Sequence, residues 1–142
     1  GHLAKFQASE AVRFGWERNN CLIASILNPN QEGDLPNKDH SFLSCEQENI
    51  VLTALKVSEE GIENGIMVRA WETGGKDTVA SFDVSALGVT SAVETDLLER
   101  DKERLEISNG KVSDLIRARG ITTIRLLLDK RKYYPKSVDE NI

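Results

Sequence analysis

Short apolar runs and alternating apolar and polar positions dominate the chain, and both patterns predict strands rather than helices. The clearest alternation covers residues 89–98, where the odd positions from Val89 to Leu97 are expected to share one face and the even positions the other, with one face buried. Similar segments lie at residues 21–27, 41–45, 49–57, 66–73, 77–84, 105–108 and 121–128. About eight short strands at roughly ten-residue spacing predict an all-β fold, an antiparallel two-sheet β-sandwich.

Turn signals separate these segments. Asn64-Gly65 and Asn109-Gly110 are each typical of a type I′ hairpin turn, which needs positive φ at both central residues. Gly74-Gly75 and residues 59–61 predict further turns, and residues 28–39 contain two of the three prolines and predict a loop.

Two stretches contain residues that could form a helix, residues 8–14 and residues 112–119. We assign both to strand or loop. The predicted organisation is then an N-terminal extension (residues 1–13), a β-sandwich domain (residues 14–129) and a polar C-terminal tail (residues 130–142).

Composition narrows the class of protein. With 142 residues, of which 39% are hydrophobic, the chain suits one globular domain. A net charge of −5 disfavours nucleic-acid binding, and no apolar run is long enough to span a bilayer. There is no signal-peptide pattern and no initiator Met. Gly1 and His2 look like the remnant of a removed tag, so we expect a fragment of a larger protein.

Cysteine and histidine are scarce. A structural zinc site needs four nitrogen or sulfur ligands, and outside the tag remnant only Cys21, Cys45 and His40 could contribute. We expect two buried free thiols, with a Cys21–Cys45 disulfide as the alternative. This usage favours a reducing, cytoplasmic location.

Catalytic signatures are absent from the sequence. It has no glycine-rich phosphate loop, no HExxH, no GxSxG and no kinase signature. A Ser-His-Asp triad would have to use His40 with its neighbours Asp39 and Ser41, although triad residues converge from separate segments. The acidic pairs are explained by surface solubility, and residues 99–103 are interpreted as a solvated charge cluster. We therefore predict no catalytic residue and no metal ligand in this chain.

Three side chains carry the remaining chemical interest. Trp71 is expected in the core, although both it and Trp16 could instead stack on a sugar ring or contact another domain. Arg69 lies within a mostly apolar strand, where a charge needs a partner. Glu72 falls on the opposite face, so a cross-strand acid on the solvent side is the favoured partner. The alternative is that the Arg69 guanidinium binds a carboxylate in a cleft or in another domain.

Several segments, in order, resemble the C-terminal β-domain of glycoside hydrolase family 38 α-mannosidases. The string SFLSCEQENIVLTALKVSEEGIENGIMVRAWETGG carries most of the likeness. WERNNCLIA, ETDLLERD and ITTIRLLL resemble further segments, and Cys21 stands where the family usually has Pro. The matching positions are Glu17, Asn19, Asn20, Leu22, Ile23, Asn49, Val51, Leu52, Ala54, Leu55, Lys56, Glu59 or Glu60, Gly61, Val68, Arg69, Glu72, Gly74, Asp96, Leu97, Leu98, Glu99, Thr123, Arg125 and Leu126.

The resemblance implies a non-catalytic role. In that family an N-terminal α/β barrel holds the zinc ion and the Asp nucleophile for retaining hydrolysis of terminal α-mannosides, and neither is carried over to this chain. The C-terminal β-domains pack against the barrel, and in some members their loops shape the cleft rim. The rim candidates here are Arg69, Trp71 and Glu72, with the loop at residues 73–77. Trp71 stands where the family commonly has Tyr.

The function expected from the sequence is therefore a non-catalytic α-mannosidase domain whose partner is the catalytic domain of the same polypeptide. Zinc is expected only in that missing domain. A homo-oligomeric contact is a further role. The alternatives are a carbohydrate-binding β-sandwich module that holds α-mannosides, and a purely structural interaction domain.

Overall fold

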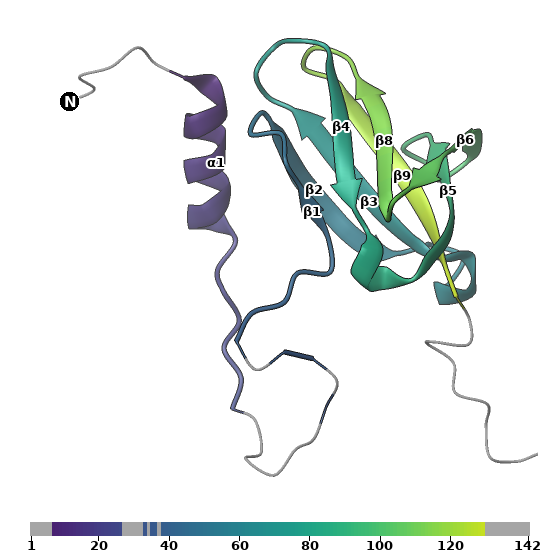
Figure 1. Ribbon diagram of the computed structural model, residues 1–142. Coiled ribbons are helices and arrows are strands. Elements are labelled where there is room, and N and C mark those ends of the chain that lie inside the picture. The colour runs from purple at the N-terminus through teal and green to yellow at the C-terminus, as the bar shows by residue number, and fades with distance from the viewer. Residues whose placement is uncertain (1–6, 27–32, 34, 37, 130–142) are drawn as a thin grey trace, which may run out of the picture.

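The computed structural model describes residues 7–26, 33, 35–36 and 38–129 (Figure 1). The predicted tag remnant, the predicted tail and most of the predicted 28–39 loop lie outside these residues. Two antiparallel sheets face each other, which confirms the predicted sandwich. One sheet has the order β1 (Ser44–Cys45), β4 (Thr78–Asp83), β8 (Lys111–Ile116) and β7 (Ile107–Ser108). The other has the order β2 (Ile50–Val57), β3 (Ile66–Glu72), β9 (Ile121–Leu128), β5 (Val89–Thr95) and β6 (Asp101–Leu105).

Aliphatic and aromatic side chains from both sheets fill the space between them. Val68, Ala70 and Ile124 come from the five-stranded sheet, and Phe82 and Val112 come from the four-stranded sheet. Each is at most 2% exposed. Successive side chains of a strand point to opposite faces, so these residues define the inner face of each sheet.

The alternation predicted for β5 breaks down. Ala92, predicted on the face opposite Val89, is fully buried in the core, while Val93 is only half-buried. The pairing of β5 shifts register against β9 between Val89 and Ser91, and against β6 between Val93 and Thr95. Each irregularity adds a residue to one of the paired strands. It therefore changes whether the odd-numbered or the even-numbered residues of the strand face the core.

The two predicted hairpin signals have different outcomes. Asn109 and Gly110, between β7 and β8, have φ of 51° and 74°, so the left-handed turn predicted there is confirmed. At Asn64-Gly65 the prediction is wrong, because only Gly65 has positive φ and the connection from β2 to β3 includes a 3₁₀ turn, η1 (Ile62–Asn64). Gly65 serves a close approach instead, since a Cβ there would lie 2.3 Å from the Leu126 carbonyl oxygen.

An α-helix, α1 (Ala8–Asn19), precedes the sandwich, so the strand or loop predicted for residues 8–14 is wrong. The Asn19 and Asn20 side chains donate to the carbonyls of Gly15 and Trp16 and close the last turn. For residues 112–119 the prediction is confirmed, because most of them belong to β8. A second 3₁₀ turn, η2 (Ser85–Leu87), links β4 to β5.

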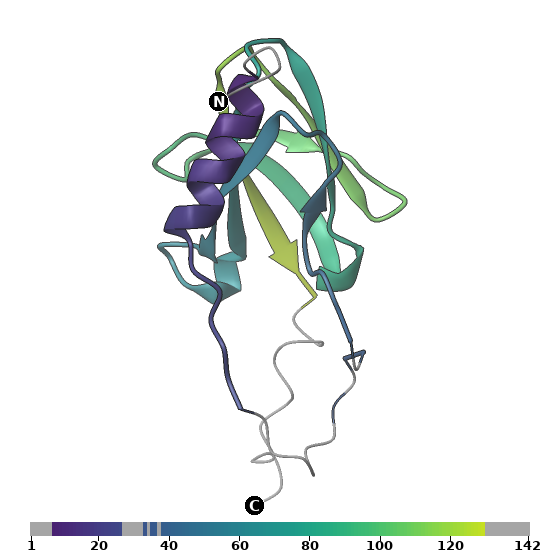
Figure 2. The ribbon, with the colours of Figure 1, turned by 90° about the vertical axis from the view of Figure 1, so that its left-hand side faces the viewer.

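The helix lies outside the two sheets. Figures 1 and 2 both place α1 beside the edge where β1 and β2 lie. None of its residues is buried, and it crosses the predicted domain boundary at residue 13. The first paired strand of the sandwich begins only at Ser44. No helix among the described residues combines the length and apolar character needed to cross a membrane.

Residues 21–26 continue from α1 without forming a strand, so the strand predicted from this apolar run is wrong for these residues. They pair with neither sheet. Cys21 is exposed and free, and Cys45 is half-buried and free. The expected pair of free thiols is therefore found, but the expected burial of Cys21 is wrong.

Candidate functional site

The three predicted site residues lie on β3, between β2 and β9. Arg69 and Trp71 share the outer face of the five-stranded sheet, because Val68 and Ala70 occupy the inner face. Trp71 is half-buried there, beside Val51 and Ile121 in the strand register. The predicted core position for Trp71 is therefore wrong. Trp71 directly follows Ala70, whose side chain faces the core, so the Trp71 side chain points to the opposite face of the sheet.

Arg69 has neutral partners. Its Nε donates to the Thr123 hydroxyl at 3.2 Å, and its Nη2 donates to the Leu97 carbonyl at 3.3 Å. None of the ion pairs among the described residues includes Arg69, so the predicted cross-strand acid is wrong. The strands beside Arg69 present Ala54 and Thr123 in register with it, and neither is acidic. The guanidinium remains half-exposed on the sheet surface.

Glu72 has a different environment. Its side chain has no exposed surface. Its carboxylate accepts hydrogen bonds from Asn49, from the loop that follows β3 and from the turn before β9. Oε1 accepts from the Gly74 N–H and from Asn49 Nδ2, both at 2.7 Å. Oε2 accepts from the N–H groups of Gly75, Lys76 and Arg119, at 2.8, 3.2 and 2.8 Å.

These donors decide the charge of Glu72. Burial by itself would raise the pKa of the carboxyl, but the hydrogen bonds from Arg119, Asn49, Gly75 and Gly74 outweigh it and lower the pKa to about 2. The group is therefore ionised throughout the physiological range. A buried, saturated carboxylate of this kind holds backbone in place and has no surface on which to meet a substrate.

The loop that Glu72 holds is residues 73–77, between β3 and β4. Its bends confirm the turn predicted at Gly74-Gly75, and Gly75 has φ of 79°. A Cβ at Gly74 would lie 2.9 Å from Glu72 Oε1, and one at Gly75 would lie 3.3 Å from the Arg119 guanidinium. The loop therefore needs both glycines in order to close around the carboxylate.

A second set of contacts ties this loop to the turn that joins β8 and β9. Asp77 forms an ion pair with Arg117 at 2.6 Å and accepts a hydrogen bond from the Ala118 N–H at 2.9 Å. The Glu72 N–H donates to the Gly120 carbonyl, and the Thr73 N–H donates to the Asn49 carbonyl. We call this end of the sandwich, made of Glu72 with residues 73–77 and 117–120, the braced platform. The exposed side chains of Lys76, Arg117 and Arg119 lie around its buried carboxylate.

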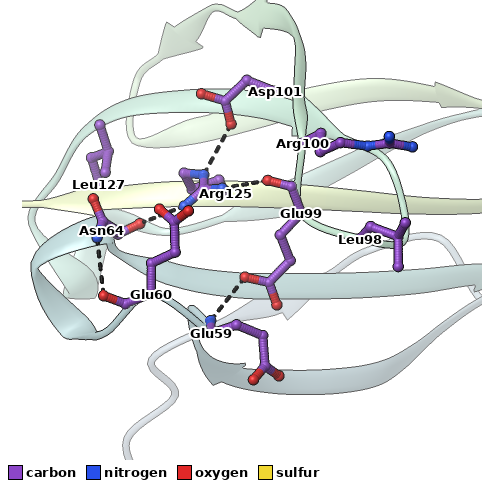
Figure 3. A pocket seen from close by; sticks show the side chains of 9 residues that line it. All are labelled: Glu59, Glu60, Asn64, Leu98, Glu99, Arg100, Asp101, Arg125 and Leu127. Atoms are coloured by element: carbon purple, nitrogen blue, oxygen red, sulfur yellow. Dashed lines mark hydrogen bonds and ion pairs between the residues drawn. The ribbon is translucent and has the colours of Figure 1, made fainter.

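A hollow of about 490 Å³ lies on another part of the five-stranded sheet, near β6 and the end of β2 (Figure 3). Arg125, almost buried beneath it, donates to Asp101 at 3.0 Å, to the Ser58 hydroxyl at 3.2 Å and to the carbonyls of Asn64 and Glu99. The residues that line the hollow are Glu59, Glu60, Asn64, Leu98, Glu99, Arg100, Asp101, Arg125 and Leu127.

Glu99 is the second ionised anchor. Its carboxylate pairs with Lys56 at 2.7 Å and accepts from the Ser58 hydroxyl and the Glu59 N–H. The Lys56 hydrogen bond is the largest influence on this carboxyl, and it lowers the pKa to about 2 despite the opposing effect of burial. The solvated-cluster interpretation of residues 99–103 is therefore wrong for Glu99, whose side chain is only 8% exposed.

Two of the four acids around this hollow, Glu99 and Asp101, are already held by basic side chains of the same network. One partner of the acid pair that a glycosidase needs must hold a proton near neutral pH. Glu99, at a pKa of about 2, cannot serve as that acid, and Asp101 is engaged by Arg125. No group of three or more His, Cys, Asp and Glu residues within the described ranges could hold a metal ion.

The sequence interpretation missed these networks because it treated each charge by its immediate neighbours. The usable signal was the set of residues that carries the family resemblance. Six of them, Asn49, Lys56, Glu72, Gly74, Glu99 and Arg125, contribute to the two networks. The second candidate aromatic, Trp16, lies apart from both networks, in a groove of about 410 Å³ with His40 and Phe42.

Comparison with known proteins agrees with this architecture. No curated protein matches the chain. The family model described as "Glycosyl hydrolases family 38 C-terminal beta sandwich domain" matches residues 49–126, more than half of the chain. The match runs from the asparagine that binds Glu72 to the strand that carries Arg125. The chain therefore belongs to the family of glycosyl hydrolase family 38 C-terminal beta sandwich domains.

Proposed function

We propose that this chain is the non-catalytic C-terminal domain of an α-mannosidase, which packs on the catalytic barrel and shapes the rim of its cleft. The observation that carries the proposal is the braced platform around Glu72 within a domain of this family. A buried anion with five donors fixes a loop far more rigidly than an ordinary surface turn. Rigid loops on a β-scaffold are the usual means of presenting contact residues.

Within this proposal the three candidate residues, Arg69, Trp71 and Glu72, have different roles. Glu72 positions the loop at residues 73–77 and makes no contact with the sugar. Arg69 and Trp71, on the outer face of the sheet, would face the barrel or the rim. Arg69 Nη1 makes none of the hydrogen bonds among the described residues, so the guanidinium retains donors for a carboxylate of the neighbouring domain or for sugar hydroxyls.

The bond cleavage itself belongs to the barrel in this proposal. The parent enzyme would hydrolyse terminal α-mannosides by a retaining, zinc-assisted mechanism. The described residues offer no cluster suited to zinc, so we assign them no step in that chemistry. Their contribution is to hold the barrel and to limit the shape of the cleft.

The proposal is tested with Arg69→Ala in the full-length enzyme. Arg104, an exposed arginine on β6, provides the matched control as Arg104→Ala. If Arg69 lies at the cleft, kcat/KM for an aryl α-mannoside should fall by roughly 10-fold or more, with Tm within about 2 °C of the wild type. A lower Tm with unchanged turnover in the folded fraction would place Arg69 at a purely structural contact. Unchanged values of both would remove it from the rim.

The groove at Trp16 supports a second candidate, a carbohydrate-binding module. Trp16 is 38% exposed, and the His40 and Phe42 rings form an edge-to-face pair with centroids 4.6 Å apart. Exposed aromatic faces suit the apolar face of a pyranose ring. Titration of the isolated chain with α-mannosides should then change the fluorescence of the wild type and of Trp71→Phe, but not of Trp16→Phe. A flat titration of all three would reject the module.

A further inference from the structure

The most fully exposed aliphatic side chains of the described chain lie before the sandwich. Leu22, Ile23 and Ile26 are 100%, 97% and 100% exposed. No backbone hydrogen bond joins residues 21–26 to any other part of the described chain. Three exposed large aliphatic side chains in one hexapeptide without backbone hydrogen-bond partners form a candidate interaction surface, because the burial of aliphatic surface is favourable.

The pattern of this hexapeptide is that of a strand. Leu22, Ala24 and Ile26 would share one face, and Cys21, Ile23 and Ser25 would share the other. The first face is entirely apolar and the second is mixed. This is the composition of a strand that turns one face into a core and leaves the other partly covered.

The adjoining helix is only lightly attached to the sandwich, through a groove at Trp16 and a hydrogen bond from Arg13 to the Glu48 carbonyl. α1 buries none of its residues, includes Gly15, and leaves Phe14 66% exposed. A 12-residue helix that buries none of its side chains is marginal in water. Residues 8–26, which we call the N-terminal arm, thus expose large apolar side chains at Phe14, Leu22, Ile23 and Ile26.

The arm contributes no residue to the described core of the sandwich. The core cluster of the sandwich and the hydrophobic residues packed against it include no residue before Leu43. The family match begins at residue 49, so the arm lies upstream of the matched residues. The family is one of C-terminal domains, whose members follow other domains in the same polypeptide. The occupant that these facts favour is the domain immediately upstream.

We propose that residues 21–26 add as a strand to the edge of a sheet in the domain that precedes this one in the same polypeptide, with Leu22 and Ile26 entering that domain's core. Exposed sheet edges accept an extended segment through main-chain hydrogen bonds, and the alternate side chains give specificity. Phe14 of α1 then covers the same neighbour. This inference rests on the proposed function, for which it names the contact that joins the two domains.

Hydrogen–deuterium exchange tests the strand addition directly. Amides of residues 21–26 should exchange at the unstructured rate in the isolated chain, and about 100-fold more slowly or better in the full-length polypeptide. Equally fast exchange in both would overturn the proposal. Protection that appears in the isolated chain and increases with its concentration would also overturn it, since a second copy of this chain would then be the occupant.

A pair of double variants separates this contact from general surface apolarity. Leu22→Ser with Ile26→Ser should return residues 21–26 of the full-length polypeptide to the isolated-chain exchange rate. The control, Leu97→Ser with Leu98→Ser, also replaces two exposed aliphatic side chains with serine, at positions 60% and 74% exposed. It should leave that protection unchanged. Loss of protection in neither variant, or in both, contradicts the assignment of Leu22 and Ile26.

The exchange result does not depend on enzymatic activity. A protected arm in a polypeptide that fails to hydrolyse α-mannosides would leave the strand addition standing and reject the proposed function. An active α-mannosidase with an unprotected arm would reject only the strand addition.

Discussion

The sandwich and the N-terminal arm differ in how well their side chains are accommodated within the described chain. In the sandwich, buried polar groups are satisfied internally: Glu72 has five donors and Arg125 has four acceptors. In the arm, aliphatic and aromatic side chains face solvent and no residue of α1 is buried. The contrast separates a unit that stabilises itself from a segment whose apolar surface is suited to another domain.

The largest effect should come from a phenylalanine truncation made in both regions. Phe82→Ala removes a core ring that is 1% exposed and should lower the free energy of unfolding by about 3–5 kcal/mol. Phe14→Ala removes a ring that is 66% exposed and should change it by less than about 0.5 kcal/mol. Urea unfolding of the isolated chain measures both. Equal losses would mean that the arm belongs to the folded core.

Removal of the buried charge should have the next largest effect. Glu72→Gln keeps the size of the side chain but turns an amide NH₂ toward backbone N–H donors, and should cost about 2–3 kcal/mol in free energy of unfolding. Glu60→Gln, at an exposed acid, provides the control and should stay within about 0.5 kcal/mol. A Glu72→Gln chain as stable as the wild type would show that the platform does not depend on the carboxylate.

The acid limb of stability should show the most gradual effect. The pKa values of Glu72 and Glu99 are about 2 in the folded chain, below the ordinary glutamate value near 4.5. Between these pH values the unfolded chain binds more protons than the folded chain. The stabilisation from both carboxylates is therefore complete above about pH 4.5 and is lost as pH falls toward 2.

Comparison with Glu72→Gln isolates the contribution of one carboxylate. This variant should lose stability less steeply than the wild type between pH 4.5 and 2, because one of the two titrations is gone. Urea unfolding at a series of pH values gives both slopes. Identical slopes would contradict the depressed pKa of Glu72.

The fold class was accessible from the sequence because the strand signals are local. Period-two patterns and turn residues such as Asn109-Gly110 depend on neighbouring positions alone. The face assignment of β5 failed because its register irregularities arise from pairing with β6 and β9, which no local pattern encodes. The strand expected at residues 21–27 failed for residues 21–26 because a strand needs a pairing partner as well as a suitable composition.

The candidate site was only partly accessible from sequence. Arg69 drew attention as a charge in an apolar strand, but its neutral partners, Thr123 and Leu97, come from β9 and from the segment after β5. Glu72 was chosen as a contact residue, yet its carboxylate accepts a hydrogen bond from the N–H of Arg119, 47 positions away along the chain. Such long-range convergence is a property of the folded sandwich, so sequence spacing could not reveal it.

The central claim is that this domain assists a catalytic partner and performs no hydrolysis itself. The most direct measurement is zinc-supplemented turnover of an aryl α-mannoside by the full-length polypeptide and, separately, by the isolated 142-residue chain. We predict turnover by the full-length polypeptide and none by the isolated chain. Turnover by the isolated chain, or an inactive full-length polypeptide that is correctly folded, would contradict the claim.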